Sequence, residues 1–477
     1  MNSGKPLPWA GILMGVGVVL ILYFFYQHLP YFGNVSWLGG VLMLEILIAS
    51  IWKYERRFFA LLMIAFVWAG LGVPFQESWR GGGRWLVLAA GAAVGFIIWS
   101  KVPRRPFGSI HLIAFFCASA AFVSATVSQW VQMASLKALS LFLLFTYCAS
   151  GARLAVLGRE ERFFRGLLWG CQFVVYVTAI CYFVLGDSIW GNPNSLGAAM
   201  GIGAFPILLW GWLTSDVPGV RLRRLAALLL CTYLVYFSMA RAAMASVMLV
   251  TLIFCVCLRQ YKLLVKVVAL VLVLVAINGM LDPGGLNKRL GDIKDAVLYK
   301  GHKEEGLLNS RKAPWEKTKA SIKEHPWFGT GYGTAPTGEN PGFGFGIVSS
   351  TAETSREHGS SYMTIAEWVG LLGVAPFVAI LAVTVSNVCK VCVWMRRTAD
   401  PRHYSIPLAM VVLSGLVHAS FEDWLFAVGY YCCVFFWVFA FVLADLIPDA
   451  VVVPVAGAVS RTSRPSPADF GAVVPTR

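Results

Sequence analysis

The stretch SREHGSSYMTIAEWVGLLG, residues 355–373, decides the fold, because there a long polar segment, residues 281–360, gives way to an apolar run. Outward from it, almost the whole chain is apolar: 58% of its 477 residues are hydrophobic and 13% are charged, against about 25% charged in soluble domains. Apolar runs of about 20 residues recur, the length that crosses a bilayer as a helix. The runs are continuous rather than alternating, which excludes a membrane barrel. The expected fold class is an all-α polytopic integral membrane protein with one large extracytoplasmic loop bearing short helices.

The lengths of the apolar runs predict about fourteen transmembrane helices, with a range of about 12–14 because two tight turns are ambiguous. The runs lie near 9–27, 36–52, 58–75, 85–100, 108–125, 129–150, 164–185, 195–214, 223–238, 241–257, 262–280, 361–389, 406–420 and 424–446. They divide the chain into an N-terminal bundle of about 11 spans at 1–280, a loop at 281–360, C-terminal helices at 361–446 and a disordered cytoplasmic tail at 447–477. We expect the first run to be a span and not a cleaved signal.

Basic residues concentrate in alternate loops between the predicted spans, such as KYERR (53–57), KVPRR (101–105) and RLRR (221–224). The loops between them are mostly poor in Lys and Arg, with ESWRGGGR (77–84) as the exception. The positive-inside rule then places both termini in the cytoplasm and the long loop outside. Because the formal charge of +15 sits mostly in these short loops, we expect no nucleic-acid partner.

The long loop carries start and stop signals for one helix. Ser310 is a candidate cap, Pro314 suits a first turn, and Pro326 disfavours helical geometry in the residue before it. GTGYG (329–333) follows as a flexible turn. Residues 283–306 are predicted to be a short amphipathic helix followed by a solvated stretch, and residues 338–350 a Gly- and aromatic-rich cover on the membrane surface.

Two residues on the predicted outer side point to chemistry. His358 lies just before a span and could take a proton from a hydroxyl, or could simply hydrogen-bond a backbone carbonyl. Arg241, in YFSMARAAMASV (236–247), lies at an outward-facing turn and could hold a phosphate, or could snorkel to lipid headgroups. GNPNSLG (191–197) also faces outward, with Asn194 or Ser195 as the expected helix cap.

Other outer-side residues are candidates for binding an anionic or sugar substrate. Tyr332 belongs to the aromatic-rich loop, and Glu422 lies in LVHASFEDWLF (416–426) beside His418 and Asp423. A carboxylate there could orient a histidine or bind a sugar hydroxyl, or could belong to a plain polar turn. The basic candidates are Arg311, Arg356, Arg80, Arg84 and Lys137. Each of these could instead be a solvated or snorkelling charge.

The sequence offers no signal for metal or nucleotide chemistry. It has no phosphate-binding loop of the GxxxxGK[ST] type, no HExxH and no DxD-type acidic pair in the long loop. We therefore predict no metal site and no cofactor.

Two ordered motifs carry a family resemblance. The first is R-x3-W-x6-I-x3-P-x2-G-x-G from Arg311 to Gly331, and the second is H-x3-Y-x4-E-x2-GLLG from His358 to Gly373. With YFSMARAAMASV and GNPNSLG, they resemble the O-antigen ligase and polymerase superfamily over roughly residues 190–373. The chain departs from the family pattern at Gly359, where Asn or Ser commonly follows the histidine.

The resemblance implies a membrane glycosyltransferase of the bacterial inner membrane. Its donor would be an undecaprenyl-diphosphate-linked glycan, and its acceptor a hydroxyl of a glycan or a lipid core, on the outer face of the bilayer. By resemblance, Arg241 and Arg311 would hold the diphosphate and His358 would be the general base of an inverting transfer. Polysaccharide-assembly proteins are possible partners.

Three readings stand side by side at this point. One is the glycan ligase or polymerase, between which the sequence does not choose. A second is a glycan transporter or flippase, although the spans carry few of the midplane polar residues typical of transporters. A third is a non-catalytic scaffold for polysaccharide export. Unchanged activity after substitution of His358 would favour it.

Overall fold

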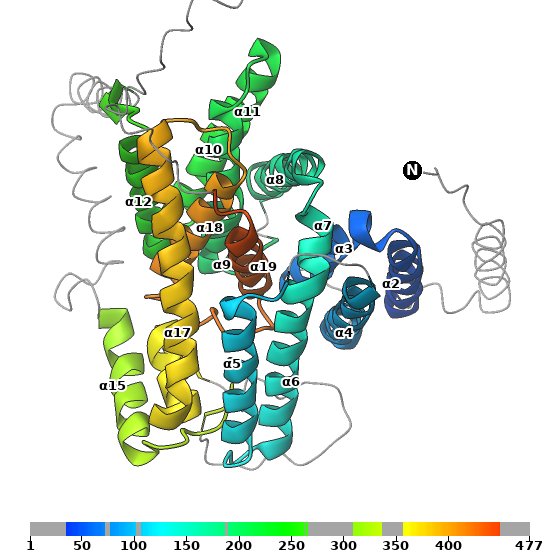
Figure 1. Cartoon of the computed structure of the whole chain (residues 1–477), viewed down its shortest axis with the longest axis vertical. Coiled ribbons are helices and arrows are strands. Elements are labelled where there is room, and N and C mark those ends of the chain that lie inside the picture. The colour runs from blue at the N-terminus through cyan, green and yellow to red at the C-terminus, as the bar shows by residue number, and fades with distance from the viewer. Residues whose placement is uncertain are drawn as a thin grey trace, which may run out of the picture.

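The computed structural model describes residues 35–71, 77–101, 106–186, 189–262, 264–265, 309–335 and 356–448, and these residues form helices without a strand. The all-α fold class is therefore confirmed for the described chain. The helices are α2 Val35–Trp52, α3 Tyr54–Gly70, α4 Glu77–Lys101, α5 Ser109–Ala125, α6 Val131–Tyr147, α7 Arg153–Val156, α8 Glu160–Phe183, α9 Pro193–Ala198, α10 Phe205–Leu213, α11 Pro218–Phe237, α12 Arg241–Cys257, α15 Asn309–Glu324, α17 Ser361–Thr398, α18 Ser405–His418 and α19 Tyr431–Asp445 (Figure 1). Two π-helical turns, η2 Cys148–Ala152 and η3 Ala199–Ala204, join α6 to α7 and α9 to α10.

Five described helical stretches are long and apolar enough to cross a membrane. They are Gly82–Lys101, Val131–Val156, Glu160–Phe183, Pro193–Leu213 and Ser361–Thr398. Four shorter apolar helices, α5, α12, α18 and α19, lie among them. The count of about fourteen spans is not reproduced and stays a prediction. The run at 9–27, residues 266–280 of the run at 262–280, the loop stretches 283–306 and 338–350, and the tail from 449 lie outside the described residues.

The last helix occupies the middle of the bundle. Every residue of α19 from Tyr431 to Leu443 is buried, as expected of a helix that is apolar all round. Large apolar side chains of α5 and α8, such as Phe116 and Phe173, are exposed instead. An outer surface of that kind suits lipid contact.

The predicted start of the last span is wrong. It was expected at residue 424, but α19 begins at Tyr431, and residues 419–430 form turns. Their apolar side chains are buried by other elements: Phe426 packs edge-on against Phe377, with ring centroids 5.0 Å apart. The Leu425 carbonyl accepts from the Trp437 indole at 2.7 Å. Burial by long-range contacts produces the same apolar pattern as a span, which explains the error.

A buried ion pair fixes the far end of α19. Arg153 donates to both carboxylate oxygens of Asp445, at 2.6 and 2.8 Å. Its guanidinium also lies 4.2 Å from the Trp99 ring centroid, in cation–π geometry. These contacts tie α19 to α7 and α4.

Helix α17 is broken at Gly370, which has φ +65° and ψ −176°. The break removes two helical hydrogen bonds, from Leu371 to Glu367 and from Leu372 to Trp368. The loop after α15 replaces both. The amides of Leu371 and Leu372 donate to the carbonyls of Pro326 and Trp327, at 2.8 and 3.1 Å.

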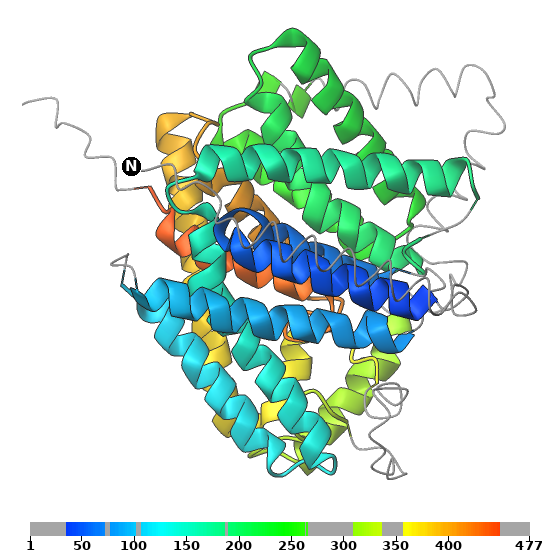
Figure 2. The same cartoon turned by 90° about the vertical axis from the view of Figure 1, so that its right-hand side faces the viewer.

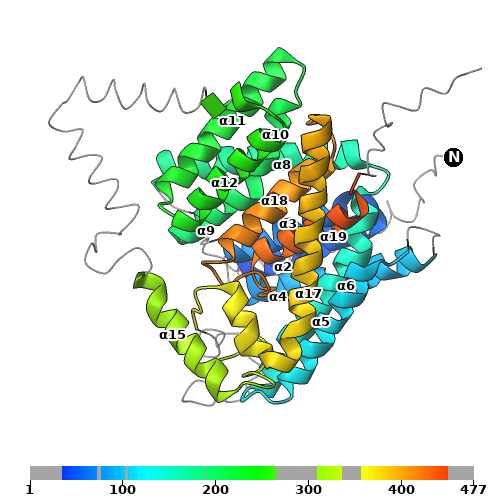
Figure 3. The ribbon, with the colours of Figure 1, turned by 60° about the vertical axis from the view of Figure 1, so that its left-hand side comes forward.

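The same loop supplies donors for the two carbonyls that the break leaves open. The amides of Thr330 and Gly331 donate to the carbonyls of Glu367 and Trp368, at 3.0 and 3.2 Å. The loop is thus inserted into the hydrogen-bond ladder of α17, and α15 lies beside the first part of α17 (Figure 3). These hydrogen bonds connect the end of the first sequence motif to residues 367–372 of the second.

Candidate active site

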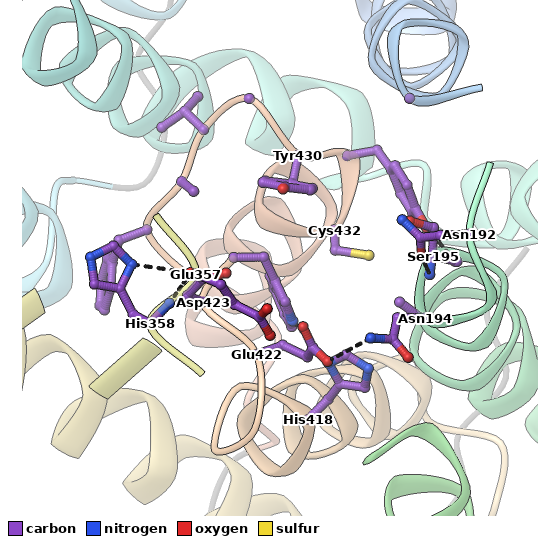
Figure 4. A pocket seen from close by; sticks show the side chains of 18 of the residues that line it. Asn192, Asn194, Ser195, Glu357, His358, His418, Glu422, Asp423, Tyr430 and Cys432 are labelled. Carbon is purple, nitrogen blue, oxygen red and sulfur yellow. Dashed lines mark hydrogen bonds and ion pairs between the residues drawn. The ribbon is translucent and has the colours of Figure 1, made fainter. Parts of the chain in front are cut away.

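A cavity of about 1070 Å³ lies where the start of α9, the GTGYG loop, residues 356–358 and the turn before α19 meet. Figure 4 shows His358 at one end of it, Asn192 and Ser195 at the other, and the carboxylates of Glu422 and Asp423 between them. This is the region in which the two sequence motifs converge.

His358 is held by one carboxylate at two points. Its backbone amide donates to Asp423 Oδ2 at 3.0 Å, and its ring Nδ1 lies 3.1 Å from the same oxygen. A carboxylate only accepts, so Nδ1 carries the proton of that bond and Nε2 is the basic nitrogen. The ring is 1% exposed and stands edge-on to Trp368. This is the arrangement that orients an imidazole for proton transfer.

The other ring nitrogen faces a second carboxylate. His358 Nε2 lies 3.5 Å from Glu367 Oε2 and has no hydrogen-bond partner among the described residues. Glu367 is fully buried and binds Arg356 through both oxygens, each at 2.7 Å. Arg356 also donates to Thr318 Oγ1 at 3.1 Å, which links this pair to α15. Arg356 lines the cavity, but its charge is already matched by Glu367.

The structure explains why glycine occupies position 359, where the chain departs from the family pattern. Its φ of +74° favours glycine, and a Cβ there would lie 3.2 Å from Trp315 Nε1 and 3.3 Å from Arg311 Cδ. The Trp315 indole donates to the Gly359 carbonyl at 3.1 Å. Gly359 therefore lets α15 approach closely and brings Arg311 to the edge of the site.

Arg311 binds two carboxylates, Glu357 and Glu422. Glu422 also accepts from the Asn194 amide at 3.1 Å. Burial raises the pKa of Glu422 to about 7, although the positive charge of Arg311 opposes this shift. Glu422 therefore gains or loses a proton near neutral pH, and the charge around Arg311 changes with it.

Asp423 behaves in the opposite way from its neighbour. Burial alone would raise the pKa of Asp423, but the hydrogen bonds and charge of His358 outweigh burial and lower it. Asp423 is thus a carboxylate at neutral pH. Two adjacent acids with pKa values pushed apart are typical of sites that move protons.

The structure places most of the other predicted residues at the cavity with protein partners. Arg84 donates to the Gly429 carbonyl at 2.8 Å, Lys137 to the Gly333 carbonyl at 2.5 Å, and the Tyr332 hydroxyl to the Phe426 carbonyl at 2.6 Å. All three line the cavity and brace the two loops that form its wall.

Two predicted arginines stand apart from this group. Arg241 begins α12 and lies within electrostatic reach of Arg311. Arg80 lies in α4, and its side chain is outside the described residues. None of the contacts of these predicted residues tests a role in catalysis, so their roles stay predictions.

Two helix starts differ from expectation. Asn192, rather than Asn194 or Ser195, caps α9: its Oδ1 accepts from the Ser195 amide at 2.7 Å. Asn194 is thereby left to bind Glu422. Helix α15 begins at Asn309, so Ser310 lies inside its first turn. Its end at Glu324, before Pro326, agrees with the prediction.

Sequence reasoning did not identify the partners of three residues that shape the site. Glu367 was visible only as the acid of the second motif. The sequence placed His418 and Asp423 in a polar turn where a carboxylate could orient a histidine. It did not identify His358 as the partner of Asp423 or Trp424 as the partner of His418. Asp423 and His358 are 65 residues apart, and local sequence carries no information about a contact over that separation.

A second, largely apolar cavity of about 790 Å³ adjoins the first. It lies between α3 and α8, which run alongside each other in Figure 2. Its walls include Phe59 and Met63 of α3 and Val174 of α8, and Tyr431 and Cys432 line both cavities. We call this second cavity the α3–α8 groove.

Comparison with known families adds an independent finding. Residues 226–378 match the family model described as O-antigen ligase, and no curated protein matches the chain. The matched range contains Arg241, Arg311 and His358, so the resemblance inferred from the motifs is confirmed. Together with the apolar helices, the match indicates a membrane protein of a glycan ligase and polymerase family. The domain at residues 226–378 therefore supports membership of the O-antigen ligase and polymerase superfamily.

Proposed function

We propose that this protein transfers a glycan from an undecaprenyl-diphosphate donor to a hydroxyl acceptor at the outer face of the bacterial inner membrane. The observation that carries the proposal is His358, buried at the wall of a large cavity and held between Asp423 and Glu367. Glycan transfer requires removal of a proton from the acceptor hydroxyl, whereas export leaves the glycan chemically unchanged, which is why we favour transfer over export.

The two cavities together suit an amphiphilic donor. The first cavity has room for a diphosphate and sugar units, and two residues of its wall, Glu357 and Glu422, bind Arg311. The α3–α8 groove offers apolar walls to a polyprenyl chain, and Tyr431 and Cys432 line both this groove and the first cavity. A lipid-linked sugar could thus lie with its head at His358 and its tail in the groove.

In the proposed reaction, the acceptor oxygen bonds to the anomeric carbon while the bond from that carbon to the diphosphate oxygen breaks. The hydroxyl proton passes to His358 Nε2, and Asp423 stabilises the imidazolium that forms. The electron pair of the broken bond goes to the diphosphate, which basic groups such as Arg311 stabilise. Attack opposite the leaving group inverts the anomeric centre.

Access to Nε2 requires a local movement. The atom is enclosed and faces Glu367, so the acceptor must enter between them, or the ring must turn toward the cavity. Catalytic hydrogen bonds often form only when substrate is bound. The Asp423 bond would serve as the pivot for such a turn.

The test is glycan synthesis in a strain that lacks the gene, complemented with wild type, His358→Ala or His325→Ala. His325 is exposed near the end of α15 and is a control of the same residue type. We expect stable, membrane-inserted His358→Ala to accumulate lipid-linked precursor without product, whereas His325→Ala makes product normally. A size ladder of product would indicate a polymerase, and a single transferred unit a ligase. Normal product from His358→Ala would refute the proposal.

A further inference from the structure

His418 is a second histidine of the cavity that the proposed reaction does not use. It is the last residue of α18, is 2% exposed and lines the cavity wall. Figure 4 shows it near Glu422 and Asn194, away from His358. A buried imidazole at a substrate cavity must either have its nitrogens paired or offer one of them to the ligand.

One nitrogen of His418 is paired in a way that fixes its protonation. The Trp424 indole Nε1 lies 2.9 Å from His418 Nδ1. An indole N–H can only donate, so Nδ1 accepts and carries no proton. The neutral ring must then carry its proton on Nε2. Trp424 thus selects the tautomer in which Nε2 is a donor.

The bond between Trp424 and His418 is held rigidly. Trp424 is 5% exposed and packs on Phe436, with ring centroids 6.0 Å apart. The turn between the two residues is closed by the Phe421 amide, which donates to the His418 carbonyl at 3.0 Å. The donor tautomer is therefore built into the turn before α19.

A guanidinium group lies near His418. Arg311 lies within electrostatic reach of the ring, and Glu422, the nearest acid on the same turn, is already bound to Arg311 and Asn194. A neutral N–H donor beside a guanidinium can bind an anionic oxygen without adding a repulsive charge.

We propose that His418 Nε2–H donates a hydrogen bond to an oxygen of the donor's diphosphate. His418 would thus stabilise the leaving group and would not act as a base. The inference rests on the proposed function. While the bond from the anomeric carbon to the diphosphate oxygen breaks, negative charge grows on the diphosphate, and the Nε2–H bond strengthens. His418 keeps its proton throughout.

Two substitutions separate this role from a purely structural one. In His418→Asn, the amide oxygen can take the place of Nδ1 and accept from Trp424, but the donor to the cavity is lost. In His418→Gln, the amide nitrogen can take the place of Nε2 and still donate. We expect farnesyl diphosphate, a short-chain probe, to bind purified His418→Asn about tenfold to a hundredfold more weakly than wild type, the size of a hydrogen bond to a charged group.

The expected result is near-normal binding by His418→Gln and weak binding by His418→Asn, with both variants unfolding at a temperature close to that of wild type. Near-normal binding by His418→Asn would overturn the inference, as would equal weakening of both folded variants. Product formation by wild type is measured separately. If wild type forms no product, the proposed transfer reaction is refuted. The binding comparison would still report on the diphosphate subsite.

A measurement on an unmodified His418 covers the case in which both variants unfold. His358 and His418 are the histidines that line the cavity. In His358→Gln labelled with 15N-histidine, we expect a 31P–15N dipolar coupling between bound farnesyl diphosphate and a protonated ring nitrogen. Absence of this coupling with the probe bound would overturn the inference.

Discussion

Arg356 binds both carboxylate oxygens of Glu367, each at 2.7 Å, and the same carboxylate lies 3.5 Å from His358 Nε2. Glu367, in the first part of α17, therefore connects this helix to the proposed base His358. Through Arg356 it also connects α17 to α15. Because Glu367 is fully buried, its charge depends on these partners.

Removing the charge of Glu367 should destabilise the fold. In Glu367→Gln, the Arg356 guanidinium loses its partner, and breaking a buried pair costs about 3–5 kcal/mol. We expect the low end, because Arg356 stays partly exposed. Thermal unfolding in detergent should fall clearly below that of Glu316→Gln, a control at an exposed position of α15. Equal unfolding temperatures would show that the pair does not stabilise the protein.

The break in α17 should depend on glycine. In Gly370→Ala, the new Cβ would lie 2.4 Å from the Trp327 carbonyl oxygen, and φ of +65° would be strained. We expect loss of thermal stability and of product, because the loop would leave the helix ladder. Gly219→Ala is the control, since a Cβ there meets nothing within 4 Å. A Gly370→Ala protein as stable as this control would contradict the loop insertion.

Glu422 should make stability depend on pH. Its pKa is about 7 in the folded protein and near 4.5 when exposed, so the folded state binds more protons between these values. Stability contributed by Glu422 is therefore complete below about pH 4.5 and is lost as pH rises through about 7. At about 1.4 kcal/mol per pKa unit, the effect is on the order of 3 kcal/mol. Glu422→Gln should reduce the dependence of the unfolding temperature on pH over this range. An unchanged pH dependence would contradict the role of Glu422.

Diphosphate must compete with carboxylates for Arg311. Glu357 is 61% exposed on its side chain and binds Arg311, so neutralising it should free part of the guanidinium. We expect Glu357→Gln to bind farnesyl diphosphate more tightly than wild type, by about fivefold or less, because exposed pairs contribute up to about 1 kcal/mol. Glu324→Gln, an exposed acid at the other end of α15, should bind like wild type. Weaker binding by Glu357→Gln would place the diphosphate away from Arg311.

The proposed orientation of His358 predicts a loss of rate in Asp423→Asn. The variant keeps an oxygen for the backbone amide of His358 but cannot stabilise an imidazolium with its charge. General base catalysis contributes about 10²–10⁴-fold, and we expect product formation to fall within that range while farnesyl diphosphate binding changes little. The rate and the binding are both measured on membranes with equal protein. A rate like that of wild type would remove Asp423 from the mechanism.

The sequence by itself determined the helical membrane fold, the end of α15 at Pro326 and the family motifs around Arg311 and His358. These features depend on local properties: apolar run length, the steric effect of proline and the order of residues in a motif. The sequence could not show that α17 breaks at Gly370, because GLLG lies inside an apolar run that reads as one helix.

Only the tertiary structure decided how the candidate site is arranged. It brought Asp423 to His358, Glu422 to Arg311 and Trp424 to His418, and it moved the start of α19 from residue 424 to Tyr431. Apolar patterning records that a residue is buried but not which element buries it. Long-range partners are chosen by packing and by the need to pair buried polar groups, and these are properties of the whole fold.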